Sequence, residues 1–323
     1  MTISARRGGG SGRDRPAAPS APRTRGSAVE ARARRDNRTG LLFSAPFLVL
    51  FVAFSALPVV ASLALSFTDF TSRDLRDVLG VDFVGLEQYA QLFGSTRYLR
   101  SLLNTLVFVV VGVPLTIGVG LILAVLLNNG IKRFRTVFRV GFYAPVVTSI
   151  VAVAVVWRLI LQPDGLLNSV LGWVGISGPD WLQSTTWALP SLVAMAVWRN
   201  FGTLMVIFLA GLQDVPEDVI EAATMDGAGA WRRFHSIVLP LLRPAILFGA
   251  VVTGAGFLQF FEEPFVMTQG GPLDATYSAA YFAYDQFGFG NYGYASAASY
   301  VLFAAVVVIT LIQFRLLGSK DRP

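Results

Sequence analysis

Six long apolar stretches follow one another along the chain. Each is long enough for an α-helix to cross a hydrocarbon core of ~30 Å, which takes roughly 20 residues. The stretches lie near 42–67, 102–127, 140–161, 188–211, 245–261 and 297–316. This pattern predicts an all-α integral membrane protein with six transmembrane helices.

The first stretch has a second interpretation, the apolar core of a cleaved signal peptide. It follows about 40 residues of polar chain. Its apolar run also exceeds the 7–15 residues typical of signal-peptide cores. We therefore expect this stretch to remain in the protein as a span.

Charges in the connections predict the orientation, because cytoplasmic loops are enriched in Lys and Arg. The 128–139 connection holds four basic residues and no acid. The 162–187 and 262–296 connections hold acids and no base, so we place them outside. Both termini are then cytoplasmic, including the short C-terminal tail 319–323. The 212–244 loop is cytoplasmic by parity, although it holds five acids against three arginines.

Residues 1–38 differ in composition from the rest of the chain. They contain ten arginines and three acids and show no apolar periodicity. Such a segment cannot bury enough surface to offset its ordering entropy, so we predict a disordered basic cytoplasmic tail. It is either a leader whose charge fixes the topology or an arm that contacts anionic headgroups.

Composition excludes several kinds of chemistry. The chain has no cysteine and one histidine, His235, which we expect to be solvated in its loop. Neither Lys132 nor Lys320 follows a glycine, so no P-loop can be drawn and the chain does not hydrolyse ATP by that route. We expect no catalytic residue, no metal site and no cofactor bound by this chain.

The 214–244 loop has the pattern of two short helices joined at glycines. Asp214 and Glu217 have the spacing of a capping box at the start of the first helix. Gly227 and Gly229 end that helix, and a second amphipathic segment starts at Ala230. Such an elbow either presents its small residues to a partner protein or rests on lipid headgroups as an interfacial helix.

The loop also carries a recognisable string. The order Glu221-Ala222-Ala223-x-x-Asp226-Gly227-Ala228, followed nine positions later by Ile237-x-Leu239-Pro240, resembles the EAA loop of permease subunits of binding-protein-dependent ABC importers. The resemblance is to the sugar-type branch that includes the maltose permeases, and it covers roughly residues 40–318. Flanking motifs occur in the same order: Asn104-Thr105, Gly165-Leu-x-Asn168, Leu239-Pro240-Leu-x-x-Pro244, Met267-Thr268-x-Gly270-Gly271-Pro272 and Gly293-Tyr-Ala295.

The resemblance implies a fold, a function and a set of partners. Residues 39–318 would form the transmembrane domain of an importer in a bacterial plasma membrane, carrying a carbohydrate such as a di- or oligosaccharide. The partners would be a second, different permease, two ATPase subunits that bind ATP and Mg, and an extracellular solute-binding protein that contacts the 268–296 loop. The chain would also contact membrane lipid, and no nucleic acid is implied.

By the same resemblance, the EAA loop would form a coupling helix that docks into a groove on an ATPase subunit. Closure of the ATPases on ATP would then turn the cavity outward. The residues that would couple to the ATPase are Glu221, Ala222, Ala223, Asp226 and Gly227.

Polar side chains within the spans are candidates for the substrate path, because burying them in a bilayer is costly. Arg199 and Asn200 lie near the middle of the fourth stretch. They either face a cavity or form structural bonds, an ion pair with Glu262 or Glu263 or a hydrogen bond to backbone. Gln259 and Glu262 are candidates for contacting sugar hydroxyls near the phenylalanines of the fifth stretch, which are otherwise core or interface residues.

Two other function classes remain open from the residues alone. An ion-coupled secondary transporter acting alone predicts inverted repeats and paired acids within the spans. A membrane enzyme requires an acid/base pair or metal set within the spans. The sequence shows none of these features, so we favour the importer subunit.

Overall fold

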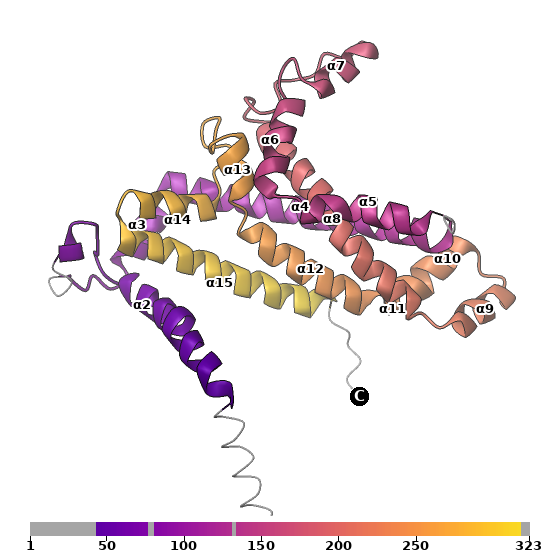
Figure 1. The fold of residues 1–323 in the computed structure, drawn as a ribbon, viewed down its shortest axis with the longest axis horizontal. Coiled ribbons are helices and arrows are strands. Elements are labelled where there is room, and N and C mark those ends of the chain that lie inside the picture. Colours follow the sequence, from indigo (N-terminus) through magenta and orange to yellow (C-terminus); the bar gives the residue numbers. More distant parts are fainter. Residues whose placement is uncertain (1–42, 77–80, 131–133, 318–323) are drawn as a thin grey trace, which may run out of the picture. The chain divides into compact units, whose positions relative to one another are not determined.

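The computed structural model describes residues 43–76, 81–130 and 134–317 (Figure 1). In these residues the regular elements are helices, apart from an isolated bridge between Thr68 and Phe83. The expected tails, 1–38 and 319–323, lie outside the described residues. Contacts divide the chain into one unit that ends at Val59 and another that starts at Val60.

The helices follow one another as the apolar stretches predict, with several short helices between them. Their bounds are Leu57–Leu65 (α2), Glu87–Gly94 (α3), Thr96–Asn129 (α4), Arg135–Val147 (α5), Ile150–Ile160 (α6), Leu166–Trp173 (α7), Ala188–Gln213 (α8), Glu217–Met225 (α9), Ala230–Arg233 (α10), Leu239–Leu241 (α11), Arg243–Leu258 (α12), Glu262–Met267 (α13), Ala279–Gly288 (α14) and Tyr292–Leu317 (α15). A 3₁₀ turn covers Asp74–Arg76, and π-helical turns cover Val52–Ala56 and Phe234–Val238.

Four helices are long and apolar enough to cross a membrane. They are Phe43–Leu65, which ends in α2, and α4, α8 and α15. The number becomes six if each of two bent helix pairs is counted as one span. None of the residues in the most apolar window of Phe43–Leu65 is buried.

The 140–161 stretch is not one straight helix. α5 and α6 meet at a bend of 98°, with Thr148 and Ser149 between them. Pro145 lies in the last turn of α5 and has no N–H to donate to the preceding turn. The hydroxyl of Thr148 donates to the carbonyl of Ala144 at 2.9 Å and so satisfies part of the helix end.

The 245–261 stretch also differs from a single span. α12 ends at Leu258, and Gln259 to Phe261 separate it from α13. A bend of 65° precedes α12, where the segment Ala230–Leu241 meets it at Leu242.

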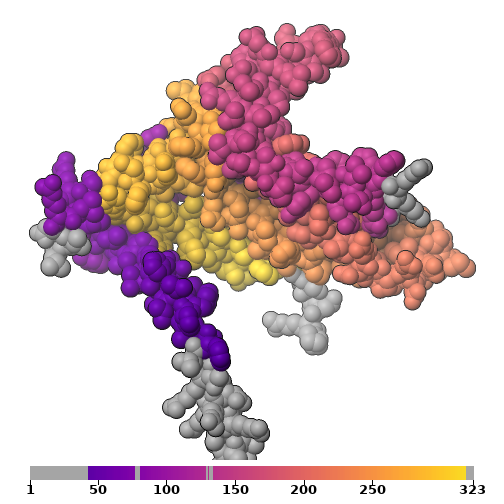
Figure 2. Space-filling model, in the orientation of Figure 1, coloured from indigo at the N-terminus to yellow at the C-terminus, as the bar shows by residue number. Residues whose placement is uncertain are grey.

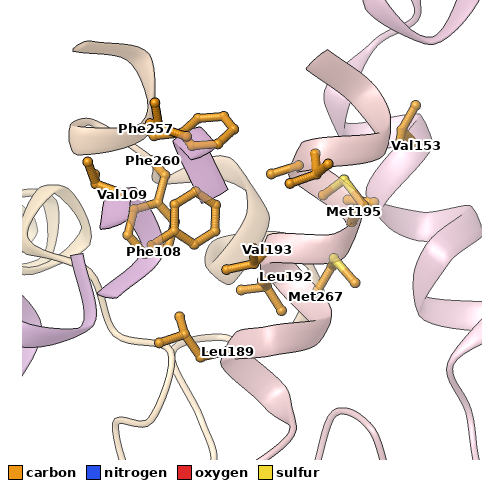
Figure 3. Close-up of a cluster of buried hydrophobic side chains, with 14 of the residues drawn as sticks. Phe108, Val109, Val153, Leu189, Leu192, Val193, Met195, Phe257, Phe260 and Met267 are labelled. Atoms are coloured by element: carbon orange, nitrogen blue, oxygen red, sulfur yellow. The ribbon is translucent and has the colours of Figure 1, made fainter. Parts of the chain in front are cut away.

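The core of the larger unit forms where α4, α8 and α12 pack together (Figure 3). Phe108 of α4 stacks on Phe260 with ring centroids 3.9 Å apart and meets Phe257 edge-on at 5.1 Å. Gly120 brings α4 close to α8, because a Cβ there would lie 2.9 Å from that of Leu204. α8 thus packs on α4, α5 and α12.

Candidate functional site

The EAA-like string folds as a helical elbow. α9 ends at Met225, Gly227 follows with φ +76°, and α10 starts at Ala230. The N–H of Ala228 donates to the carbonyl of Ala223, and that of Gly227 to the carbonyl of Thr224, both at 3.0 Å. This is a Schellman motif with glycine at its left-handed position. The predicted helix break at Gly227 is thus observed.

The predicted capping box is wrong. α9 begins at Glu217 after an extended Pro216, and its first turn has no side-chain cap. Asp214 instead lies at the C-terminal end of α8. The reason is that Pro216, with φ −62° and ψ 129°, prevents the helix from starting two residues earlier.

The elbow lies at the end of the larger unit opposite α3 and α14 (Figure 1). It forms an orange projection in the space-filling view (Figure 2). Glu221, Ala222, Asp226 and Gly227 are exposed on it, whereas Ala223 is buried. The five residues of the predicted coupling set therefore lie together on one short helix and the turn that ends it.

Two large apolar side chains on the elbow lie outside the predicted coupling set. Met225 is 88% exposed and Trp231 is 76% exposed, one on each side of Gly227. Large side chains this exposed, among the acids Glu217, Glu221 and Asp226, are typical of a surface that binds a partner. Their signal in the sequence was a Met and a Trp close to the glycines of an otherwise polar turn.

Arg233 was also missed. Its guanidinium Nη1 donates to the hydroxyl of Thr224 at 2.9 Å and to the carbonyl of Ala228 at 3.1 Å. The arginine therefore connects α10 to the last turn of α9 across the two glycines. Only the structure shows this, because nine residues and a change of direction separate the partners.

The predicted path residues are not all brought together. Asn200 donates its side-chain amide to the carbonyl of Ala196 at 2.8 Å, the backbone bond that the sequence left as an alternative. Within the described residues Arg199 makes no ion pair within 4 Å, and its Nε has no hydrogen-bond partner. Glu262 is exposed at the start of α13.

Gln259 differs from these three because it lines a cavity of about 720 Å³. Ser62, Tyr284, Ser296 and Tyr300 also line it, together with alanine, leucine, valine and phenylalanine side chains. Amide and hydroxyl groups beside aromatic rings provide both hydrogen bonds and apolar faces to a ligand. Gln259 was predicted from the sequence as a contact for sugar hydroxyls, whereas no residue of α14 or α15 was predicted to have that role.

Glu263, next to Glu262, is buried, with 5% of its surface exposed. Its Oε2 has no hydrogen-bond partner in the described part of the chain. Burial raises the pKa of Glu263 to about 7, and the charge of Arg199 opposes part of that rise. The sequence left an ion pair of Arg199 with either glutamate as one alternative; among the described residues no such pair lies within 4 Å.

The buried carboxyl predicts a pH dependence of stability. The folded pKa of Glu263, about 7, lies above the ordinary 4.5, so between these values the folded chain holds a proton that the unfolded chain has released. The free energy of unfolding should therefore fall as pH rises from about 4.5 to about 7. Thermal unfolding in detergent at a series of pH values across this pH range measures the fall in stability. Glu263→Gln should flatten the profile, whereas Glu87→Gln, at an exposed site, should not; an unchanged profile in Glu263→Gln would contradict the assignment.

The motif Asn104-Thr105 binds the segment that directly follows the motif Met267 to Pro272. The amide of Asn104, on α4, donates to the carbonyls of Asp274 and Tyr277 at 2.8 and 3.0 Å. The hydroxyl of Thr105 accepts from the N–H of Ala279 at 3.0 Å. The loop after α13 is thus held at the end of the unit opposite the elbow.

Replacing Asn104 by alanine should loosen this loop, because the buried carbonyl of Tyr277 loses its side-chain donor at a cost of about 1–3 kcal/mol, and the part-buried carbonyl of Asp274 loses one of its two donors. Hydrogen exchange of the amides in 270–279 should become faster. Arg97→Gln is the control, since the Arg97–Asp274 pair spans 3.2 Å between side chains that are 46% and 36% exposed, and exposed pairs contribute about 0–1 kcal/mol. Equal exchange in both variants would rule out the tether.

Comparison with known proteins identifies the family. Residues 89–320 match the family described as binding-protein-dependent transport system inner membrane component. The probable ABC transporter permease YesP of Bacillus subtilis is 39% identical over 288 residues, which cover 87% of this chain and 91% of YesP. The lactose transport permease LacF of Rhizobium radiobacter is 34% identical, covering 85% and 92%. The trehalose/maltose permease MalF of Thermococcus litoralis is 32% identical, covering 87% and 94%.

The fold is also that of a solved importer. A chain of a bacterial ABC transporter that imports the acidic polysaccharide alginate superposes with a TM-score of 0.75. The superposition covers 90% of this chain and 100% of the other, at 22% sequence identity. With the apolar helices and the helical elbow, the family match and the sugar-transport relatives identify this chain as a multi-pass protein of the bacterial plasma membrane that belongs to the inner-membrane permease family of binding-protein-dependent ABC sugar importers.

Proposed function

We propose that the chain forms part of the translocation path for a carbohydrate, a di- or oligosaccharide, and couples to separate ATPase subunits through the elbow of α9 and α10. The observation that carries this proposal is the elbow itself. An exposed helix and a glycine turn with acids, Met225 and Trp231 on their surface connect two apolar helices, α8 and α12.

The membrane arrangement in this proposal has six spans, with the N- and C-termini in the cytoplasm. The pair α5–α6 then counts as one bent span, and α12, which follows the 65° bend at Leu242, supplies the fifth. The elbow is cytoplasmic, and the loop anchored by Asn104 is outside. The placement of the two at opposite ends of the larger unit supports this topology (Figure 1).

The elbow is directly connected to the membrane helices on both of its sides. α8 leads into α9, and the segment after α10 leads through the 65° bend into α12. Both α8 and α12 pack on α4. When two ATPase subunits close on ATP and Mg, a displacement of α9 would therefore move α8 and α12 together. This would change access to a cavity between this chain and a second permease.

A carbohydrate substrate is supported by the cavity beside Gln259 and by the relatives, whose names include lactose and trehalose/maltose transport. The amide of Gln259 and the hydroxyls of Tyr284 and Ser296 suit sugar hydroxyl groups. Arg199, Asn200 and Glu262 stay proposed path residues in the assembled permease pair. A solute-binding protein would deliver the sugar at the loop held by Asn104.

Reconstitution tests the proposal. The chain should be produced with the permease, ATPase and binding-protein subunits encoded beside it, placed in proteoliposomes, and supplied with a panel of labelled oligosaccharides. Uptake of one of them should require ATP and the binding protein. Uptake driven by an ion gradient without ATP would instead establish a secondary transporter.

A further inference from the structure

We propose that Arg233 is a positioning residue that fixes α9 relative to α10, so that movement of α9 reaches α12 instead of being absorbed at the glycines. The inference rests on the proposed coupling function and deepens it. It assigns a role in coupling to a residue outside the EAA-like string.

The geometry is a chain of three hydrogen bonds. Nη1 of Arg233 donates to the Thr224 hydroxyl at 2.9 Å and to the Ala228 carbonyl at 3.1 Å. The Thr224 hydroxyl in turn donates to the carbonyl of Ile220 at 2.7 Å. Because Arg233 lies on α10 and Thr224 and Ile220 lie on α9, one guanidinium connects the two helices and the turn between them.

The elbow has little else to hold its angle. A Cβ added at Gly227 or Gly229 would meet no described atom within 4 Å, so neither glycine is packed against another part of the described chain. Glycine also leaves the backbone free to adopt several conformations. The Schellman bonds fix the end of α9, but they do not reach α10. A charged, planar donor that binds both sides supplies that connection, and hydrogen bonds from charged groups are the stronger ones.

The neighbouring Arg232 provides a matched control. It lies on the same short helix, is exposed, and makes no hydrogen bond or ion pair with other described residues. Arg232→Gln therefore removes the same charge without touching the connection. Thr224→Val removes the acceptor and keeps every charge, whereas Thr224→Ser keeps the hydroxyl.

Two measurements distinguish a role of Arg233 in positioning α9 from a general role in folding of the chain. The chain has no cysteine, so spin labels at Asp218→Cys on α9 and Ser236→Cys beyond α10 report the distance distribution across the elbow without background from this chain. The second readout is the number of sugar molecules taken up per ATP hydrolysed in the reconstituted complex.

In Arg233→Gln and Thr224→Val the distance distribution should broaden, and uptake per ATP should fall roughly threefold to tenfold. Arg232→Gln and Thr224→Ser should match the parent in both. If Arg233→Gln fails to assemble with the ATPases, the same comparison is made with Thr224→Val and Thr224→Ser, which differ only in the hydroxyl and a methyl group.

The proposal is overturned if Thr224→Val keeps the parent's narrow distance distribution and its uptake per ATP. It is also overturned if the distance distribution of Thr224→Val broadens while uptake per ATP is unchanged. A third contradicting result is a loss of uptake per ATP in Arg232→Gln as large as that in Arg233→Gln. Failure of the proposed function itself looks different. In that case the unsubstituted complex shows no ATP-dependent uptake at all, and the distance distributions alone decide whether Arg233 stiffens the elbow.

Discussion

Gly202→Ala should prevent the chain from accumulating as a folded protein in the membrane. Gly202 lies in α8 where α5 crosses it, and an added Cβ would overlap the backbone carbonyl oxygen of Phe142 and lie 3.1 Å from the Cα of Tyr143. The backbone of α5 cannot rotate away from the new methyl group as a side chain can, so α5 and α8 must move apart. Overpacking of this kind costs about 1–3 kcal/mol or more. The yield of monodisperse protein in detergent and its thermal unfolding midpoint measure the effect.

Gly118→Ala is the control for this substitution. Gly118 lies within α4, and a Cβ there would meet nothing within 4 Å. Alanine is the better helix former by about 1 kcal/mol, so the variant should be at least as stable as the parent. If Gly202→Ala behaves like Gly118→Ala, then α5 and α8 do not pack as the structure has them.

Gly227→Val should uncouple ATP hydrolysis from transport while the chain stays in the membrane. Gly227 has φ +76°, a conformation that a β-branched residue adopts only with strain of about 1–3 kcal/mol. The end of α9 would open, and the exposed residues Glu221 and Met225 would lose their position relative to α10. Since about 1.4 kcal/mol corresponds to a factor of ten, we expect uptake to fall about tenfold or more.

The matched control is Gly229→Ala, two residues further along the same turn. Gly229 has φ −65° and ψ 163°, which alanine adopts freely, and a Cβ there would meet no neighbour. Uptake and ATPase activity should be close to those of the parent. Wild-type uptake by Gly227→Val would show that the geometry of the turn does not matter for coupling.

The sequence predicted the helical class and the elbow because both depend on local patterns. Apolar runs of the length of α4, α8 and α15 can satisfy their backbone in a membrane only as helices. Gly227 was identifiable because glycine is the residue that most readily takes the left-handed conformation at a helix end. The bend between α5 and α6 was harder to foresee, since Pro145 is compatible with either a kinked or a broken helix.

The long-range contacts could not be predicted in this way. Asn104 reaches carbonyls about 170 residues away, and its partners are backbone atoms that leave no trace in residue type. Thr105 likewise binds a backbone atom far along the chain, the N–H of Ala279. Arg233 donates to a threonine and a carbonyl, which pairing rules based on opposite charges do not find. The sequence left an ion pair of Arg199 with Glu262 or Glu263 as one alternative, but only the fold shows that Glu263 is the buried glutamate.

The most direct test of the coupling claim is a cross-link from the elbow in the assembled complex. A photoreactive residue at position 225, where Met225 is 88% exposed, should attach to an ATPase subunit. The same group at position 273, where Leu273 is 78% exposed in the loop that the proposed topology places outside, should not. A cross-link from position 225 to lipid alone, in a complex that transports sugar, would contradict the account and make α9 an interfacial helix.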